Sequence, residues 1–180
     1  MKVKHLVVAF LCMLGCCACS SPKTEVKSPD GHIKMTLTVD ENGTPFYNVS
    51  VNDSLLIENS KMGFVEGNGV ILGGGFRIEK TTFDSKDETW TQPWGENKTN
   101  RNHYNEMAVN LINEDQVQLT LRFRVFNDGV GFRYEYNVPN VDSLMITDEL
   151  TTFHFRQDGT SWSIPASAET YELLYKIGRA

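Results

Sequence analysis

The chain has 180 residues, with 17 Lys and Arg against 23 Asp and Glu, and its length suits one domain with a sizeable core rather than two. Residues 1–18 hold two lysines and no acid, so the remainder carries 15 basic against 23 acidic side chains, a net charge of −8. Such an acidic domain is a poor match for a phosphate backbone, and nucleic acid is excluded as a predicted partner.

The N-terminus has the pattern of a secretion signal. Lys2 and Lys4 form a basic start, and residues 6–14 form an apolar run that is too short to span a bilayer. A small residue then directly precedes a cysteine at both Cys16 and Cys19, which resembles the signal of bacterial lipoproteins. Cys19 is the preferred lipidation site because the polar residues begin there. An ordinary secretion signal that contains cysteines is the alternative.

This pattern predicts a signal peptide at residues 1–19, a polar tether at 20–29 and a folded domain at 30–180. The predicted location is the periplasm or outer membrane, with the lipid anchor as the only membrane contact. All four cysteines lie within residues 12–19, so the folded domain has neither a disulfide nor a cysteine nucleophile nor a zinc ribbon.

The first part of the domain has the alternation of β-strands. Apolar residues recur at every second position over residues 33–39, and Asn42-Gly43 predicts a hairpin turn into a return strand at 46–51. A further strand is expected at 55–57. The triplet Gly73-Gly74-Gly75 lacks the Lys-Ser/Thr pair of a phosphate loop, which favours a flexible turn.

Further strands are predicted at residues 77–83, 107–111, 119–125, 130–136, 150–155 and 160–164. The strongest hairpin joins 119–125 to 130–136 through the turn Asn127-Asp128-Gly129. No amphipathic helix of ten residues is expected after the signal. Short strands with turn residues between them predict an all-β, antiparallel β-sandwich.

Residues 87–106 fit neither a strand nor a helix period, and we interpret them as a loop around Pro93-Trp94-Gly95. The segment holds two of the three tryptophans, one of the four histidines and three glutamates. A loop so rich in aromatic and polar groups costs conformational entropy, which favours a binding role or an interface.

This segment supplies the predicted carbohydrate-binding residues. Trp90 and Trp94 can stack on the apolar face of a sugar ring, and polar neighbours can bond to its hydroxyl groups. These neighbours are Glu96, Lys98, Arg101, Asn102 and His103. The alternative is that the tryptophans fill the core beneath the loop while the charged groups pair with one another, and composition alone does not separate the two.

Other acidic and histidine residues make weaker sites. His103 and Glu106 have metal-ligand chemistry, but their spacing matches no metal motif and favours a structural histidine. Asp148 and Glu149 are neighbours in a strand and point to opposite faces. No G-x-S-x-G elbow is present in the sequence. The residues therefore predict a carbohydrate-type site without a named reaction.

Eight segments, in order, resemble one family and cover residues 28–175. They are Ser28-Pro29-Asp30-Gly31; Asp87-Glu88-Thr89-Trp90; Trp94-Gly95-Glu96 with Lys98; Arg101-Asn102-His103-Tyr104-Asn105-Glu106; Phe123-Arg124-Val125-Phe126-Asn127-Asp128-Gly129; Phe132-Arg133-Tyr134-Glu135; Ile146-Thr147-Asp148-Glu149; and Trp162-Ser163-Ile164-Pro165-Ala166. Together they resemble the N-terminal domain of bacterial glycoside hydrolase family 97, which includes the α-glucosidase of the starch-utilisation system.

The resemblance implies a galactose-mutarotase-like β-supersandwich that packs on a catalytic (β/α)8 barrel, followed by a small C-terminal β-domain. It implies hydrolysis of α-linked glucosides or galactosides in the periplasm, with calcium in the active site. The family includes a glutamate of this domain among its calcium ligands. The context Tyr171-Glu172-x-x-Tyr175 makes Glu172 the candidate here.

The sequence departs from the family by stopping at Ala180, before the rest of the sandwich and the barrel. An incomplete sandwich is therefore expected, from a truncated or fragmentary gene. The two carboxylates of a glycosidase belong to the barrel, so no catalytic residue is predicted and the chain alone is expected to be inactive. A freestanding carbohydrate-binding surface lipoprotein is the alternative. A metallohydrolase that uses His103 and Glu106 is a third, weaker reading.

Overall fold

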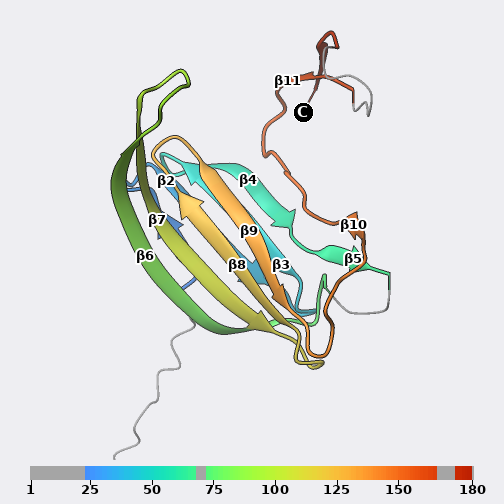
Figure 1. The fold of residues 1–180 in the computed structure, drawn as a ribbon. Coiled ribbons are helices and arrows are strands. Elements are labelled where there is room, and N and C mark those ends of the chain that lie inside the picture. The colour runs from blue at the N-terminus through green and yellow to red at the C-terminus, as the bar shows by residue number, and fades with distance from the viewer. Residues whose placement is uncertain (1–22, 68–71, 166–172, 180) are drawn as a thin grey trace, which may run out of the picture.

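The computed structural model describes residues 23–67, 72–165 and 173–179. Its strands form two four-stranded antiparallel sheets that pack face to face, with two short ladders beside them (Figure 1). The first sheet has the order β1-β2-β3-β4 and the second β6-β7-β8-β9. The strands are β1 Glu25–Lys27, β2 Ile33–Val39, β3 Pro45–Val51, β4 Ser54–Lys61, β5 Phe64–Glu66, β6 Arg77–Thr91, β7 Thr99–Ile112, β8 Gln118–Val125, β9 Val130–Asn137, β10 Ile146–Glu149, β11 Thr160–Ser163 and β12 Lys176–Arg179.

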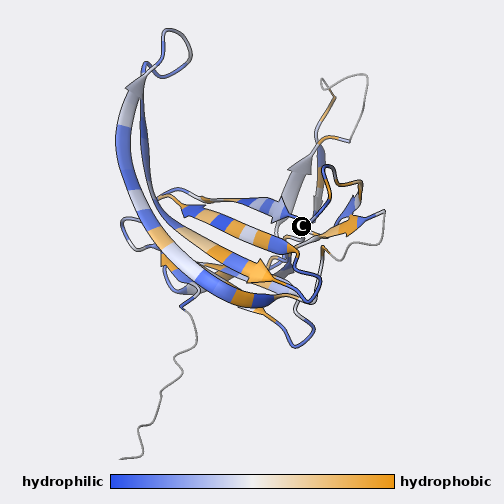
Figure 2. Ribbon diagram, turned by 60° about the horizontal axis from the view of Figure 1, so that its bottom comes forward, coloured by the Kyte–Doolittle hydropathy of each residue, from blue (hydrophilic) through white to orange (hydrophobic). Residues whose placement is uncertain are grey.

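The core lies between the two sheets, and the alternating residues of the sequence build it. Figure 2 shows the resulting alternation of apolar and polar residues along the strands. Side chains at every second position of β2 and β8 are buried because one face of each strand meets the opposite sheet. The all-β sandwich prediction is therefore confirmed. The buried core residues are Val26, Ile33, Met35, Leu37, Tyr47, Val49, Met62, Leu72, Phe76, Met107, Val109, Leu111, Val117, Leu119, Leu121, Phe123 and Val125.

The predicted loop at residues 87–106 is wrong, because these residues form two long paired strands. β6 and β7 pair from Arg77↔Ile112 to Thr91↔Thr99, whereas β8 pairs with β7 only as far as Asn105. Residues 85–91 and 99–104 therefore form a two-stranded arm that projects beyond the sandwich (Figures 1 and 2). Most of its side chains are exposed on both faces, so no apolar alternation marks the arm in the sequence.

The prediction of a strand at residues 150–155 is also wrong, because this segment does not form a regular β-ladder. The segment runs beside β4 through scattered backbone bonds and the single bridge Ile57↔Phe155. The hydroxyl of Thr152 accepts a bond from the backbone N–H of Lys61 at 2.7 Å. A side chain thus takes the place of a ladder carbonyl and interrupts the strand pattern.

The described part of the chain contains strands and turns only, and no helix there is long and apolar enough to cross a membrane. Cys16, Cys19 and Glu172 lie outside the described residues, as do the predicted signal peptide and residues 20–22 of the predicted tether. The rest of that tether is described, and its residues 25–27 form strand β1 of the first sheet.

Candidate functional site

The arm carries the predicted carbohydrate-binding residues, but on two faces and a tip. Glu88 lies opposite Asn102, and Asp87 lies opposite His103. Successive side chains of a strand point to opposite faces. Asn102 therefore shares one face with Trp90, and Arg101 and His103 share the other. Glu96, Lys98 and Trp94 lie in the turn that joins the two strands, at the tip.

The polar residues of the arm already bond to one another. The Arg101 guanidinium donates two hydrogen bonds of 2.7 Å to the Asp87 carboxylate, and these bonds lower the pKa of the Asp87 carboxyl. Asn102 donates to Glu88 at 2.9 Å, and Lys86 lies 2.8 Å from the same carboxylate. The bonds from Lys86 and Asn102 lower the pKa of Glu88. Charge pairing, one half of the alternative interpretation, is thus present in the arm.

The tryptophans do not fill the core, so the other half of that alternative is wrong. Trp90 is 51% exposed and Trp94 is 85% exposed. The tip is held by Gln92, whose backbone N–H donates to Lys98 at 3.1 Å and whose side-chain amide donates to Asn97 at 2.8 Å. The arm therefore presents Trp94 to solvent from a hydrogen-bonded turn.

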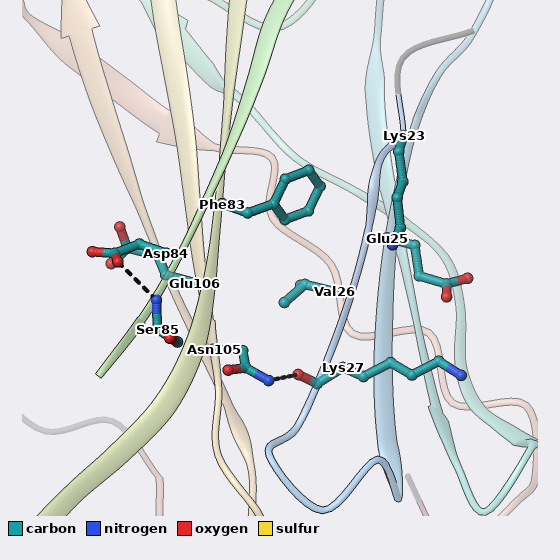
Figure 3. A pocket seen from close by; sticks show the side chains of 9 residues that line it. All are labelled: Lys23, Glu25, Val26, Lys27, Phe83, Asp84, Ser85, Asn105 and Glu106. Atoms are coloured by element: carbon teal, nitrogen blue, oxygen red, sulfur yellow. Dashed lines mark hydrogen bonds between the residues drawn. The ribbon is translucent and has the colours of Figure 1, made fainter. Parts of the chain in front are cut away.

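A groove of about 600 Å³ lies at the base of the arm, between β1 and strands β6 and β7 (Figure 3). Phe83 points into it toward Val26, and the Lys23 ammonium lies 5.7 Å from the centre of the Phe83 ring. The Asn105 amide spans it with a 2.9 Å bond to the backbone carbonyl of Lys27. The carboxylates of Asp84 and Glu106 point away from the groove, so they bring no acid to its interior.

A network of ion pairs covers the outer face of the second sheet, and we call it the arginine cluster: Arg122, Arg124 and Arg133 with Glu106 and Glu135. Glu106 is 7% exposed and accepts bonds from Arg122 and, at 2.7 Å, from the Nε of Arg124. Burial raises the pKa of Glu106, but the two arginines outweigh burial and leave this pKa below its usual value. Sequence reasoning missed the cluster, although the alternation of Arg122 and Arg124 along β8 already placed both on one face.

Glu135 in this cluster gives a testable pH dependence. Its bonds to Arg122 and then Arg133 lower the pKa of the Glu135 carboxyl from 4.5 to about 2. A lowered pKa in the folded state means that the stabilisation is complete above the unfolded pKa and is lost as pH falls toward the folded value.

We therefore expect Glu135→Gln to destabilise the domain at pH 7 by about 1 kcal/mol, a value reduced for solvent screening of this partly exposed carboxylate. The difference from the wild-type chain should shrink between pH 4.5 and about 2. Urea unfolding at pH 7, 4 and 3 measures it. A difference that stays constant over this range would show that the ion pairs do not set the effect.

The described residues contain no group of three metal-ligating side chains. His103 and Glu106 point to opposite faces of β7, since they are three positions apart along the strand. These two side chains cannot bind one metal ion together, so the metallohydrolase hypothesis has no site at this pair of residues.

The fold and the arm define an all-β class of protein: an antiparallel β-sandwich domain that exposes an aromatic arm. Residues 26–179 match the family described as glycosyl-hydrolase 97 N-terminal, so the chain belongs to this family. The resemblance found in the sequence is thereby confirmed.

Solved and curated relatives agree with this membership. The chain is 27% identical over 164 residues to a retaining alpha-galactosidase of Bacteroides thetaiotaomicron. The aligned residues cover 91% of this chain and 23% of the relative. A solved structure of a glycoside hydrolase family 97 enzyme of Pseudoalteromonas sp. strain K8, in complex with panose, is 36% identical to this chain and superposes with a TM-score of 0.78. The match covers 85% of this chain and 24% of that one. A beta-arabinopyranosidase structure matches at 27% identity and a TM-score of 0.73, over 84% and 26% of the two chains. The chain thus spans about a quarter of the length of these relatives.

Proposed function

We propose that the chain is the non-catalytic N-terminal portion of a secreted family 97 α-glycosidase, which acts on α-linked glucosides or galactosides. In this proposal it contributes to carbohydrate and calcium binding beside a catalytic (β/α)8 barrel. The carrying observation is the family match over residues 26–179, to relatives about four times as long. The lipid anchor at Cys19, the periplasmic or outer-membrane location and the calcium ligand Glu172 belong to the same proposal.

The carboxylates of the described residues support a non-catalytic role. A glycosidase needs a carboxylic acid whose pKa is raised so that it can protonate the leaving oxygen. The carboxyl groups of Asp30, Asp87, Glu88, Glu106 and Glu135 each have a lowered pKa instead. These groups are held as anions at neutral pH, and none is poised to give up a proton.

We therefore expect no release of p-nitrophenol when the purified chain is incubated with p-nitrophenyl α-glucoside or α-galactoside, with or without calcium. Reading the DNA beyond the codon for Ala180 should reveal the barrel, in frame or after a frameshift. Hydrolysis that co-purifies with the chain and survives a second purification would overturn the proposal.

A freestanding carbohydrate-binding lipoprotein is the second candidate, because Trp90 and Trp94 are exposed on the arm. Aromatic rings exposed in this way suit the apolar face of a sugar. The two candidates differ in one respect: the freestanding module binds sugar alone, whereas the glycosidase portion needs the barrel to complete its site.

Titration with maltooligosaccharides, followed by tryptophan fluorescence, separates the two candidates. If the chain binds alone, Trp94→Ala should weaken binding about threefold to tenfold. Trp162→Ala is the matched control, because Trp162 is 65% exposed but lies in β11, away from the arm. No change at millimolar sugar would exclude the freestanding module and leave the glycosidase portion.

A further inference from the structure

The arginine cluster has more hydrogen-bond donors than its own carboxylates use. Arg122 donates hydrogen bonds from Nε and both terminal nitrogens to Glu135 and Glu106. Arg124 uses only Nε, which donates to Glu106, and Arg133 uses Nε and Nη2, both directed at Glu135. Among the described residues, no partner is recorded for either terminal nitrogen of Arg124 or for Nη1 of Arg133.

The charge of the cluster is also unbalanced. Three guanidinium groups face two carboxylates, which leaves one positive charge on a chain whose net charge is −6. Asp84 lies opposite Glu106 on the same face but forms no ion pair with the three arginines, and the pair Lys86–Glu88 is neutral overall. The Arg124 guanidinium lies over the Tyr104 ring, 4.5 Å from its centre, in a cation–π contact.

The free donors border a cavity. A hollow of about 210 Å³ is lined by Arg122, Arg124, Arg133, Gly131, Phe126 and Phe132. Gly131 lies directly opposite Arg124 in the ladder, and a Cβ placed on it would meet no atom within 4 Å. The missing side chain therefore leaves open space beside Arg124. The Phe126 ring, whose centre lies 5.3 Å from that of the Tyr104 ring, lowers the local polarity, which strengthens charge-assisted bonds.

We propose that this hollow binds an oxyanion, held by the terminal nitrogens of Arg124 and by Arg133. Planar guanidinium donors suit the oxygens of a carboxylate, sulfate or phosphate group. The volume accommodates such a group but not a whole oligosaccharide. The site is separate from the tip of the arm and does not depend on the proposed glycosidase role.

The test is an NMR titration of the full-length chain with sodium sulfate, phosphate and glucuronate, each at constant ionic strength set with chloride. Saturable shifts are expected at the Gly131 amide and at the Nε–H of Arg124 and Arg133. Glucuronate alone would identify a carboxylate ligand, and sulfate or phosphate alone a tetrahedral one; either result supports the site.

Two variants and a control make the test decisive. Gly131→Val fills the hollow without removing a charge and suits a strand, so it should stay folded and weaken binding about tenfold or more. Arg124→Lys keeps the charge but loses the planar donors, and a weakening of about tenfold is expected. Arg156→Gln removes a cation that pairs with Glu58 of β4, outside the arginine cluster and the arm, and should change nothing. Shifts that never saturate, or that are equal in the wild-type chain and Gly131→Val, would overturn the proposal and show that the arginines only cross-link the sheet.

Discussion

Replacing Glu106 by alanine is expected to destabilise the domain by about 3 kcal/mol, because removal of one partner leaves buried charge uncompensated. Glu106 is 7% exposed and is shared by two arginines from the neighbouring strand. Arg122 would keep its bonds to Glu135, but Arg124 would lose its only carboxylate among the described residues. The side chains of the two arginines are 26% and 41% exposed, so water compensates part of the loss.

Urea unfolding followed by circular dichroism measures this cost, and Asp87→Ala provides the control. Asp87 accepts an equally well-formed pair of bonds from Arg101, but its side chain is 51% exposed on the arm. An exposed ion pair contributes about 0–1 kcal/mol. If the two variants lose the same free energy of unfolding, the burial of Glu106 has no energetic consequence and our account of the cluster is wrong.

The sequence predicts those strands whose one face is buried. Leu119, Leu121 and Phe123 alternate with polar residues because the sandwich buries one side of β8, and that alternation is visible without a structure. The arm has no such face. On the arm side of Asn105, β7 no longer pairs with β8; the side chains of β6 there are exposed, and most of those of β7 are half-buried or buried. Periodicity arises from burial, so a solvated hairpin leaves no pattern to detect.

The candidate site shows the same limit. The aromatic and polar residues lie in one segment of the sequence, but the pleat of β7 places Asn102 and Arg101 on opposite faces. The arginine cluster was harder still to find. Glu106, Arg122 and Glu135 lie on three strands and meet only because β7, β8 and β9 pair in one particular register. Pair positions of this kind depend on register rather than on composition.

Gly43→Ala is expected to be the other severe change, with a cost of about 3 kcal/mol or more. Gly43 has a φ of 73°, which costs other residues about 1–2 kcal/mol. A Cβ there would lie 2.2 Å from the backbone nitrogen of Phe76 and 2.5 Å from the carbonyl carbon of Gly75. Relief of this clash requires the turn to move, and the bonds Gly75 N–H to Asn42 and Phe76 N–H to Gly43 would then break. Each backbone bond contributes about 1 kcal/mol.

Gly129→Ala is the matched control, because the sequence presents Asn42-Gly43 and Asp128-Gly129 as equivalent hairpin turns. Gly129 has no positive φ, and a Cβ there would meet nothing within 4 Å. Its replacement should change the free energy of unfolding by less than about 1 kcal/mol, in either direction. Thermal unfolding of both variants should therefore separate them by about 6–12 °C. Equal melting temperatures would show that the contact between the β2–β3 turn and the segment before β6 does not contribute to stability. The positive φ of Gly43 and the packing of its turn against the start of the second sheet distinguish the two glycines.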